Sequence, residues 1–165
     1  MATHHGPLPN DETRAVVEQL KHGVAIERTF DLSHCDSNRS GLLLRAIRHL
    51  TAGTIWDGAE IEKLDVSCSA VDDDAFGEAL TLCPAATKIE VLGCRELTEA
   101  GLAGVGPHCK RLEELFAQDC LAVSPAALSS IATNCPSLRQ LCIAQCGSLT
   151  NSALISLATS AKCLE

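Results

Sequence analysis

The C-terminal half of the chain repeats one pattern every 26 residues. Two sets of cysteines and three sets of apolar residues share this interval (109 − 83 = 26, for example): Cys83, Cys109 and Cys135; Cys94, Cys120 and Cys146; Ile89, Leu115 and Leu141; Leu97, Val123 and Leu149; Leu102, Leu128 and Leu154. A fixed period of this length is typical of a solenoid, in which one repeat buries its apolar face only against its neighbours.

Each repeat contains the pattern of a strand, a turn and a helix. In the last repeat, Leu141 and Ile143 alternate with polar or small residues, which predicts a short strand over 138–144. Thr150 then precedes apolar residues at helical spacing, as an N-cap does. We therefore predict a parallel sheet with helices on one side, its repeated strands lying at 64–66, 89–91, 115–117 and 141–143.

The repeat closely matches a known consensus. Its pattern, C-x-x-L-x-x-L-x-L-x-x-C-x-x-L-T-x-x-x-L-x-x-L-A, resembles the cysteine-containing leucine-rich repeat of F-box/LRR substrate receptors in cullin-type ubiquitin ligases. Ala86 and Ala117 depart from it where leucine is usual, and Ala161 replaces a cysteine. The resemblance implies an α/β solenoid of about five repeats, curved, with the sheet on the concave face and the helices on the convex face.

Three segments are expected along the chain. Residues 1–10 are predicted to be a flexible start, 11–23 an N-terminal capping helix too short for an F-box, and 24–165 the solenoid. The solenoid is expected to be open at its C-terminal end, because Leu164 falls 26 residues after Leu138 (164 − 138 = 26), where a sixth strand begins. A partner or further repeats would cover that edge.

The early repeats are irregular. Phe30, in the first expected strand, lies 34 residues before Leu64 (64 − 30 = 34), and the extension between them holds Trp56. Trp56 is either a binding anchor or folds over the core. In the second repeat, Cys68 is interpreted as the counterpart of the later repeat cysteines. This interpretation requires that one residue is missing between Val66 and Cys68.

The ten cysteines raise three alternatives: disulfides, a metal site or free thiols. Cysteines 94, 120 and 146 are expected to stack on successive parallel strands about 4.8 Å apart, too far for an unstrained disulfide. No paired short-spacing motif favours zinc. The acidic run at 72–74 lacks the further ligands of a calcium loop and is expected to complement a helix dipole. We expect buried free thiols, no metal and no cofactor.

The net charge of −8 argues against nucleic acid or an anionic membrane as partner, because both require a basic surface. No apolar run approaches a membrane-spanning length, and the N-terminus has no signal-peptide pattern. We therefore expect a soluble protein in a reducing intracellular compartment, the cytoplasm or the nucleus.

Strand alternation predicts which side chains face outward on the concave surface. The middle row is Asp31, Asp65, Glu90, Phe116 and Cys142, acidic at one end and apolar at the other. We predict a protein-binding site there, with the remaining candidates flanking it or lying in the extension: Leu92, Glu114, Gln118 and Trp56.

Two classes of function are compared. A non-enzymatic protein-interaction module is the usual role of an extended repeat surface, either as a ubiquitin-ligase substrate receptor or as a structural subunit of a cytoskeletal or organellar assembly. An enzyme would need Cys142 as nucleophile and a histidine as base, but histidines 34, 49 and 108 are out of phase with the concave face. We expect a binding module without catalytic activity.

Overall fold

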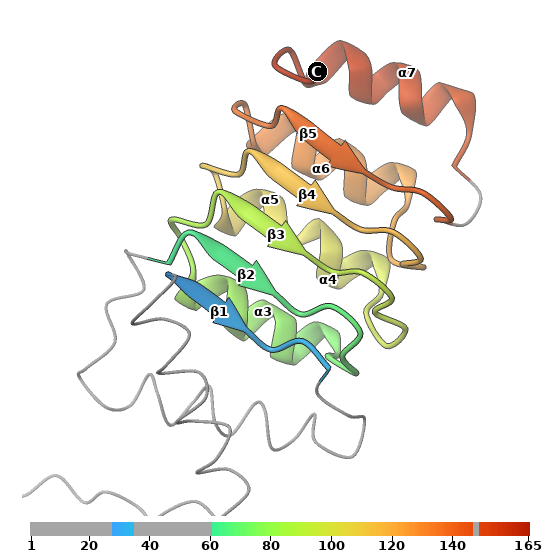
Figure 1. Cartoon of the computed structure of the whole chain (residues 1–165). Coiled ribbons are helices and arrows are strands. Elements are labelled where there is room, and N and C mark those ends of the chain that lie inside the picture. Colours follow the sequence, from blue (N-terminus) through green and yellow to red (C-terminus); the bar gives the residue numbers. More distant parts are fainter. Residues whose placement is uncertain (1–27, 35–60, 147–148) are drawn as a thin grey trace, which may run out of the picture.

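The computed structural model describes residues 28–34, 61–146 and 149–165. These contain a five-stranded sheet in the order β1-β2-β3-β4-β5, in which every neighbouring pair is parallel (Figure 1). The strands are β1 (Thr29–Asp31), β2 (Lys63–Asp65), β3 (Lys88–Glu90), β4 (Glu114–Phe116) and β5 (Gln140–Cys142). The predicted parallel pairing is confirmed, although each of the four repeated strands begins one residue earlier than predicted. The flexible start, the capping helix and Trp56 lie outside the described residues.

Helices follow the strands and lie together on one face of the sheet (Figure 1). They are α3 (Asp73–Leu82), α4 (Glu99–Ala103), α5 (Val105–His108), α6 (Pro125–Asn134) and α7 (Asn151–Ser160). Ser124 is the N-cap of α6 and accepts a hydrogen bond from the Ala127 amide (3.1 Å), and Pro125 stands in the first turn. We name the sheet face opposite the helices the open face.

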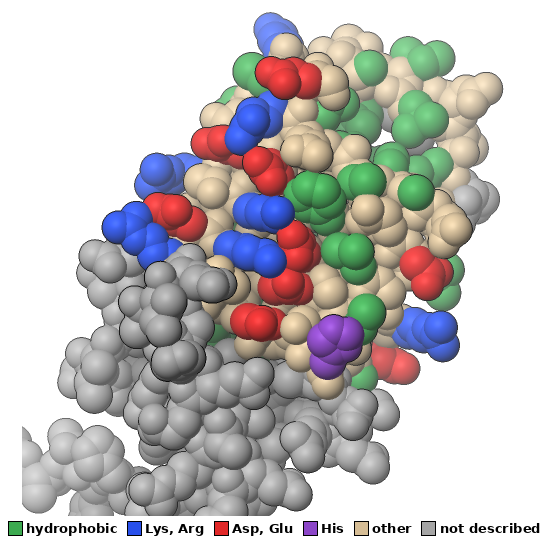
Figure 2. Space-filling view, in the orientation of Figure 1, with side chains coloured by type: hydrophobic (Ala, Val, Ile, Leu, Met, Phe, Trp, Pro, Cys, Tyr) green, Lys and Arg blue, Asp and Glu red, His purple; other side chains and the backbone are tan. Residues whose placement is uncertain are grey.

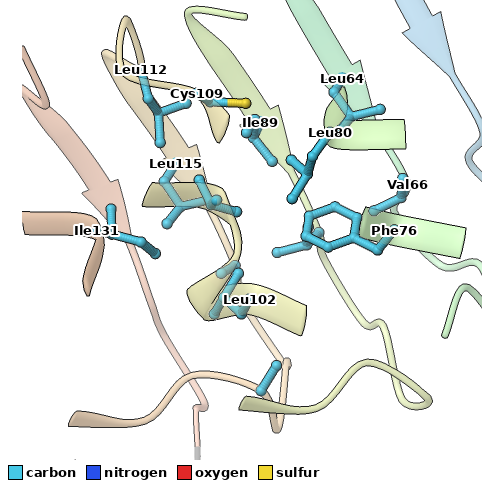
Figure 3. Close-up of a cluster of buried hydrophobic side chains, with 14 of the residues drawn as sticks. Leu64, Val66, Phe76, Leu80, Ile89, Leu102, Cys109, Leu112, Leu115 and Ile131 are labelled. Atoms are coloured by element: carbon cyan, nitrogen blue, oxygen red, sulfur yellow. The ribbon is translucent and has the colours of Figure 1, made fainter. Parts of the chain in front are cut away.

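The core lies between the sheet and the helices. Leu64, Ile89 and Leu115, one from each of three neighbouring strands, are fully buried. They point toward apolar side chains of the helices, and Figure 3 shows the cluster with Phe76, Leu80, Leu102 and Ile131. Because the alternate strand residues occupy this core, their neighbours in sequence must face the open side.

The turn after each strand uses one left-handed residue. Its φ lies between 50° and 63° at the same position of every repeat: His34, Cys68, Gly93, Asp119 and Gln145. Amides at this position donate to the next repeat, as from Asp119 to the Ala144 carbonyl (3.0 Å). Only one of the five turns uses glycine, the residue that adopts this conformation without strain.

This turn corrects the interpretation of the second repeat. Leu64 pairs with Ile89, so Ser69 corresponds to Cys94 (69 − 64 = 5; 94 − 89 = 5). Ser69 is buried and donates to the Val66 carbonyl (2.6 Å), whereas Cys68 is exposed. The prediction that Cys68 takes the repeat-cysteine position was therefore wrong. The missing residue lies after Ser69, before the helix.

One cysteine series lies in the turns, not on the strands as predicted. Cys94 donates to the Val66 carbonyl (3.1 Å), Cys120 to the Cys94 carbonyl (3.7 Å) and Cys146 to the Ala117 carbonyl (2.7 Å). Each thiol thus links its turn to the repeat before. These three thiols are buried and free.

The second series follows the helices. Cys109 donates to the Cys83 carbonyl (3.5 Å) and Cys135 to the Cys109 carbonyl (3.4 Å). Burial, with the neighbouring thiol as a second cause, raises the pKa of Cys109 to about 12 and that of Cys83 well above its ordinary value. Burial alone raises the pKa of Cys135 to about 11. Such thiols remain protonated at neutral pH and act as small apolar groups with a weak donor.

Candidate functional site

The open face carries the row of side chains that the sequence predicts. The register pairs Asp31 with Asp65, Asp65 with Glu90, Glu90 with Phe116, and Phe116 with Cys142. In β2, β3 and β4 the two outer residues are half-buried and the central one is fully buried. The strands therefore hold this row in fixed positions across the sheet.

Ion pairs cross the open face from strand to strand. Lys63 contacts Asp65 (3.1 Å) on its own strand and Glu90 (3.0 Å) on the next. Lys88 contacts Glu90 (3.0 Å) and Glu114 (3.8 Å) in the same way. Figure 2 shows basic and acidic side chains gathered over the centre of this face. We call this chain of contacts, extended by Arg139 below, the charge ladder.

Arg139, just before β5, completes the ladder. Its guanidinium contacts Glu114 (3.0 Å) and Glu113 (3.1 Å). The ladder then joins four carboxylates to three cations, for a balance of 3 − 4 = −1: Asp65, Glu90, Glu113 and Glu114 against Lys63, Lys88 and Arg139. The sequence contains a signal for this pairing, because cations recur near the acidic residues of neighbouring strands. The sequence-based prediction treated Asp65, Glu90 and Glu114 as contacts for a partner and missed it.

The ladder shifts the pKa of both groups at its β2 end, Asp65 and Lys63. Partial burial raises the pKa of Asp65, but interactions with Glu90, the Ser67 amide and Lys63 outweigh burial and hold that pKa below its ordinary value. Burial lowers the pKa of Lys63, but its contacts with Glu90 and Asp65 outweigh burial and raise that pKa above its ordinary value. Both groups are therefore charged at neutral pH and support the fold.

Asp31 lies at the β1 end of the row, outside the ladder. Its carboxylate accepts a hydrogen bond from the Ser33 amide (2.9 Å), and it makes no ion pair with another described residue. Among the described residues, the negative charge of Asp31 is therefore not balanced by a contacting cation.

An apolar group lies beside the ladder. Phe116 is half-buried, and the Lys88 ammonium lies 4.6 Å from its ring centre. Leu92 and Cys142, on the two neighbouring repeats, are also half-buried. We call Leu92, Phe116 and Cys142 the apolar cluster. Figure 2 shows hydrophobic side chains next to the central charged ones.

Gln118 lies at the edge of the apolar cluster. Its Nε2 donates to the Cys142 Sγ (3.0 Å), while its buried Oε1 has no hydrogen-bond partner among the described residues. A buried polar atom without a partner costs free energy. The Gln118 amide is therefore the least satisfied polar group on the described part of this face.

Comparisons with solved structures identify the fold. The chain is similar to Chaetomium Mex67:Mtr2 subunits, with 16% identity over 87% of this chain and 98% of that chain and a TM-score of 0.56. It is also similar to the Mex67 LRR domain from Chaetomium thermophilum, with 13% identity, the same coverages and a TM-score of 0.52. The chain has a leucine-rich-repeat-like fold. A further similar structure is Leiomodin-1 Actin-Binding Site 2, with 12% identity over 96% of this chain and 90% of that chain and a TM-score of 0.60.

Sequence comparisons add nothing to this assignment. The chain matches no family model, and no curated protein matches it. At the identities above, the structural similarity supports the leucine-rich-repeat-like fold alone. None of these comparisons supports a link to F-box receptors, which stays a prediction from the repeat pattern.

The leucine-rich-repeat-like fold keeps the candidate nucleophile apart from two of the three candidate bases. Cys142 lies on β5, whereas His34 follows β1 at the opposite edge of the sheet. His108 ends α5 on the helix side, where its Nδ1 lies 2.7 Å from the Gly104 carbonyl oxygen. His49 and Trp56 lie outside the described residues.

The described part of the chain offers neither a metal-binding cluster nor a membrane-spanning helix. No group of three histidine, cysteine or acidic side chains is placed to hold a metal ion there. None of the described helices is long and apolar enough to cross a membrane.

Proposed function

We propose that this protein is a non-enzymatic protein-binding module and that its binding surface is the open face, centred on Phe116. The observation that carries the proposal is the apolar cluster itself. Phe116 faces away from the core, so its partly exposed ring adds little to the packing between sheet and helices. Apolar groups surrounded by charged side chains commonly mark a contact surface.

The surroundings of Phe116 define the partner's chemistry. An apolar side chain of the partner would pack on the apolar cluster, where Lys88 already covers part of the ring. A basic group would lie toward Asp31, whose single carboxylate makes no ion pair with another described residue. The fitting partner is therefore a protein segment that presents an apolar residue to the apolar cluster and a basic residue toward Asp31. The charge ladder would hold the surface rigid, which lowers the entropy cost of binding.

Two narrower forms of this function remain proposals. The cysteine-containing repeat pattern supports a substrate receptor of a ubiquitin ligase, by analogy with the family it resembles. A structural subunit of a cytoskeletal or organellar assembly would use the same surface. Both forms predict a protein partner on the open face, so one set of variants tests the shared proposal. An absence of catalysis is supported by the separation of Cys142 from His34 and His108.

The test compares three bait proteins: the unmodified chain, Phe116→Asp and Leu121→Asp. Leu121 is 74% exposed and lies in the turn between β4 and α6, so it is a matched apolar-to-acid control away from the open face. Proteins that the unmodified chain captures from a cell extract would be purified and titrated against each bait. We expect Phe116→Asp to weaken the specific partner by about thirtyfold or more, because buried aromatic anchors carry about 2 kcal/mol.

Circular dichroism of each bait checks that the fold survives the substitution. Leu121→Asp should bind as the unmodified chain does. If every captured protein binds folded Phe116→Asp as tightly as it binds the unmodified chain, the apolar cluster is not the binding site. An effect of Leu121→Asp alone would place the contact at the turn between β4 and α6.

A further inference from the structure

The middle row of the open face holds two contact points at a fixed separation. Asp31 on β1 makes no ion pair with another described residue, and Phe116 on β4 has a partly exposed ring. The register places both residues in the same row, three strand-to-strand steps apart (Figure 1). Neighbouring strands lie about 4.8 Å apart, so about 14 Å separates the two positions.

The acidic residues between these two points are already paired. Lys63 contacts Asp65 (3.1 Å) and Glu90 (3.0 Å), and Lys88 also contacts Glu90 (3.0 Å). All four side chains are half-buried, and the two cations balance the two carboxylates. Among the described residues of the row, Asp31 is therefore the one acid that still attracts a basic side chain.

An extended segment of a partner matches this separation. A chain in the β conformation rises about 3.4 Å per residue, so residues four positions apart lie about 14 Å from each other. Because its side chains alternate between two faces, these two residues also point to the same side. One residue can therefore lie over Phe116 while the residue four positions away lies over Asp31.

A helical segment matches either the separation or the direction, but not both. A helix rises about 1.5 Å per residue, so about nine residues span 14 Å. Nine residues make about two and a half turns, which places the two side chains on opposite faces of the helix. Residues seven or eleven positions apart share a face, but they are separated by about 10.5 Å or about 16.5 Å along the axis.

We propose that the open face binds an extended protein segment that runs across the strands, with an apolar residue over Phe116 and a basic residue four positions away over Asp31. This inference rests on the proposed function, because it takes the open face as the binding surface. It adds the conformation of the bound segment and the spacing of its two recognition residues. Phe116 then supplies affinity for an apolar residue, whereas Asp31 selects the spacing.

The test uses synthetic peptides that each contain one leucine and one arginine in a background of serine and threonine. The arginine stands two, four, seven, nine or eleven positions from the leucine, on either side of it. Titration into the isotopically labelled chain, followed by the NMR signals of the Phe116 and Asp31 amides, gives each Kd. We expect the spacing of four, on one side of the leucine, to bind about threefold more tightly than every other spacing, because a partly exposed ion pair contributes modestly.

Three variants of the chain assign this preference to residues. Asp31→Asn should remove the preference for a spacing of four, and it keeps an oxygen that can accept from the Ser33 amide (2.9 Å). Asp74→Asn is the matched control, because it removes an exposed carboxylate from the first turn of α3 on the helix side of the sheet, and it should keep the preference. Phe116→Ala should abolish measurable binding of every peptide. Circular dichroism checks the fold of each variant.

The outcomes separate this inference from the proposed function. If Phe116→Ala abolishes binding but all spacings bind the unmodified chain equally, the open face is a binding site and the extended register is wrong. An optimum at seven or eleven would overturn the register in favour of a helical segment, and so would a preference for four that survives in Asp31→Asn.

Two further results would also contradict the inference. If no peptide shifts the signals of Phe116 and Asp31, the inference is wrong, while the comparison of bait proteins still decides the proposed function. If the peptides bind folded Phe116→Ala as tightly as they bind the unmodified chain, the apolar cluster is not used and the proposed function is wrong as well.

Discussion

The β4–α6 and β5–α7 repeats carry the same pattern and differ in burial. Leu115 and Leu128 of the first are at most 1% exposed, whereas Leu141 and Leu154 at the same positions of the second are partly exposed. Local sequence is sufficient for a strand, a turn and a helix in both. Burial depends instead on neighbours, because a repeat with repeats on both sides is covered twice and the β5–α7 repeat is covered once. The same leucine should therefore contribute unequally to stability.

The largest predicted difference is between Leu115→Ala and Leu141→Ala. Leu115 is fully buried between neighbouring strands, so its truncation leaves a cavity and should cost about 3 kcal/mol. Leu141 is already partly exposed, so its truncation should lower the free energy of unfolding by only about 1 kcal/mol. Urea unfolding followed by circular dichroism measures both, with the denaturant slope as a check that unfolding remains cooperative.

An equal cost at the two positions would contradict this comparison. It would mean that Leu141 is covered in solution by something outside the described residues. Repeating the measurement at several protein concentrations tests whether association covers Leu141. If it does, the destabilisation caused by Leu141→Ala depends on protein concentration.

Cysteine substitutions test the same contrast between buried and exposed positions, and their expected effect is of intermediate size. Cys120→Ser should cost about 1 to 3 kcal/mol, because the shorter hydroxyl cannot reach the Cys94 carbonyl that lies 3.7 Å from the thiol. Cys163 is exposed, so Cys163→Ser is the matched control and should be neutral. Thermal unfolding measures both variants.

Thiol labelling tests the same prediction without a substitution. Burial raises the pKa of Cys94 to about 12, so its thiolate is scarce at neutral pH and it should react only on unfolding. Cys68 and Cys163 are exposed and should react in the native protein. If the buried thiols of the native protein react as fast as they do after unfolding, the burial of the two cysteine series is wrong.

The sequence was sufficient to predict the parallel sheet and its helices because the same strand–turn–helix pattern occurs in several successive repeats. A pairing register needs a common period, and the 26-residue interval from Ile89 to Leu115 and Leu141 supplies it (115 − 89 = 26; 141 − 115 = 26). Alternation within each strand then predicted which side chains face outward, including Phe116. The curvature of the sheet and the binding role of the row stay predictions.

The features that the sequence analysis missed depend on three-dimensional geometry, which the 26-residue period alone does not reveal. Cys68 was assigned by residue type, although the left-handed turn residue precedes the buried position and Ser69 fills it. The ion pairs of Lys63 and Lys88 form between neighbouring strands. Strand alternation therefore predicted acidic residues on this face, whereas their ion pairs with Lys63 and Lys88 became visible only once the register was known.

The smallest predicted effect compares the two ends of the charge ladder. The Asp65 side chain is 14% exposed and Arg139 47% exposed, so Asp65→Asn should cost about 0.5 to 1 kcal/mol at neutral pH and Arg139→Gln nearly nothing. The pKa of Asp65 lies below its ordinary value of 3.8 in the folded protein, so this contribution is present above that value and is lost as pH falls through the folded pKa. Urea unfolding of the two variants and the unmodified chain between pH 7 and about pH 3 should therefore show the Asp65→Asn deficit shrinking on acidification. A deficit that stays constant across this range would mean that Asp65 acts through its shape and hydrogen bonds, without its charge.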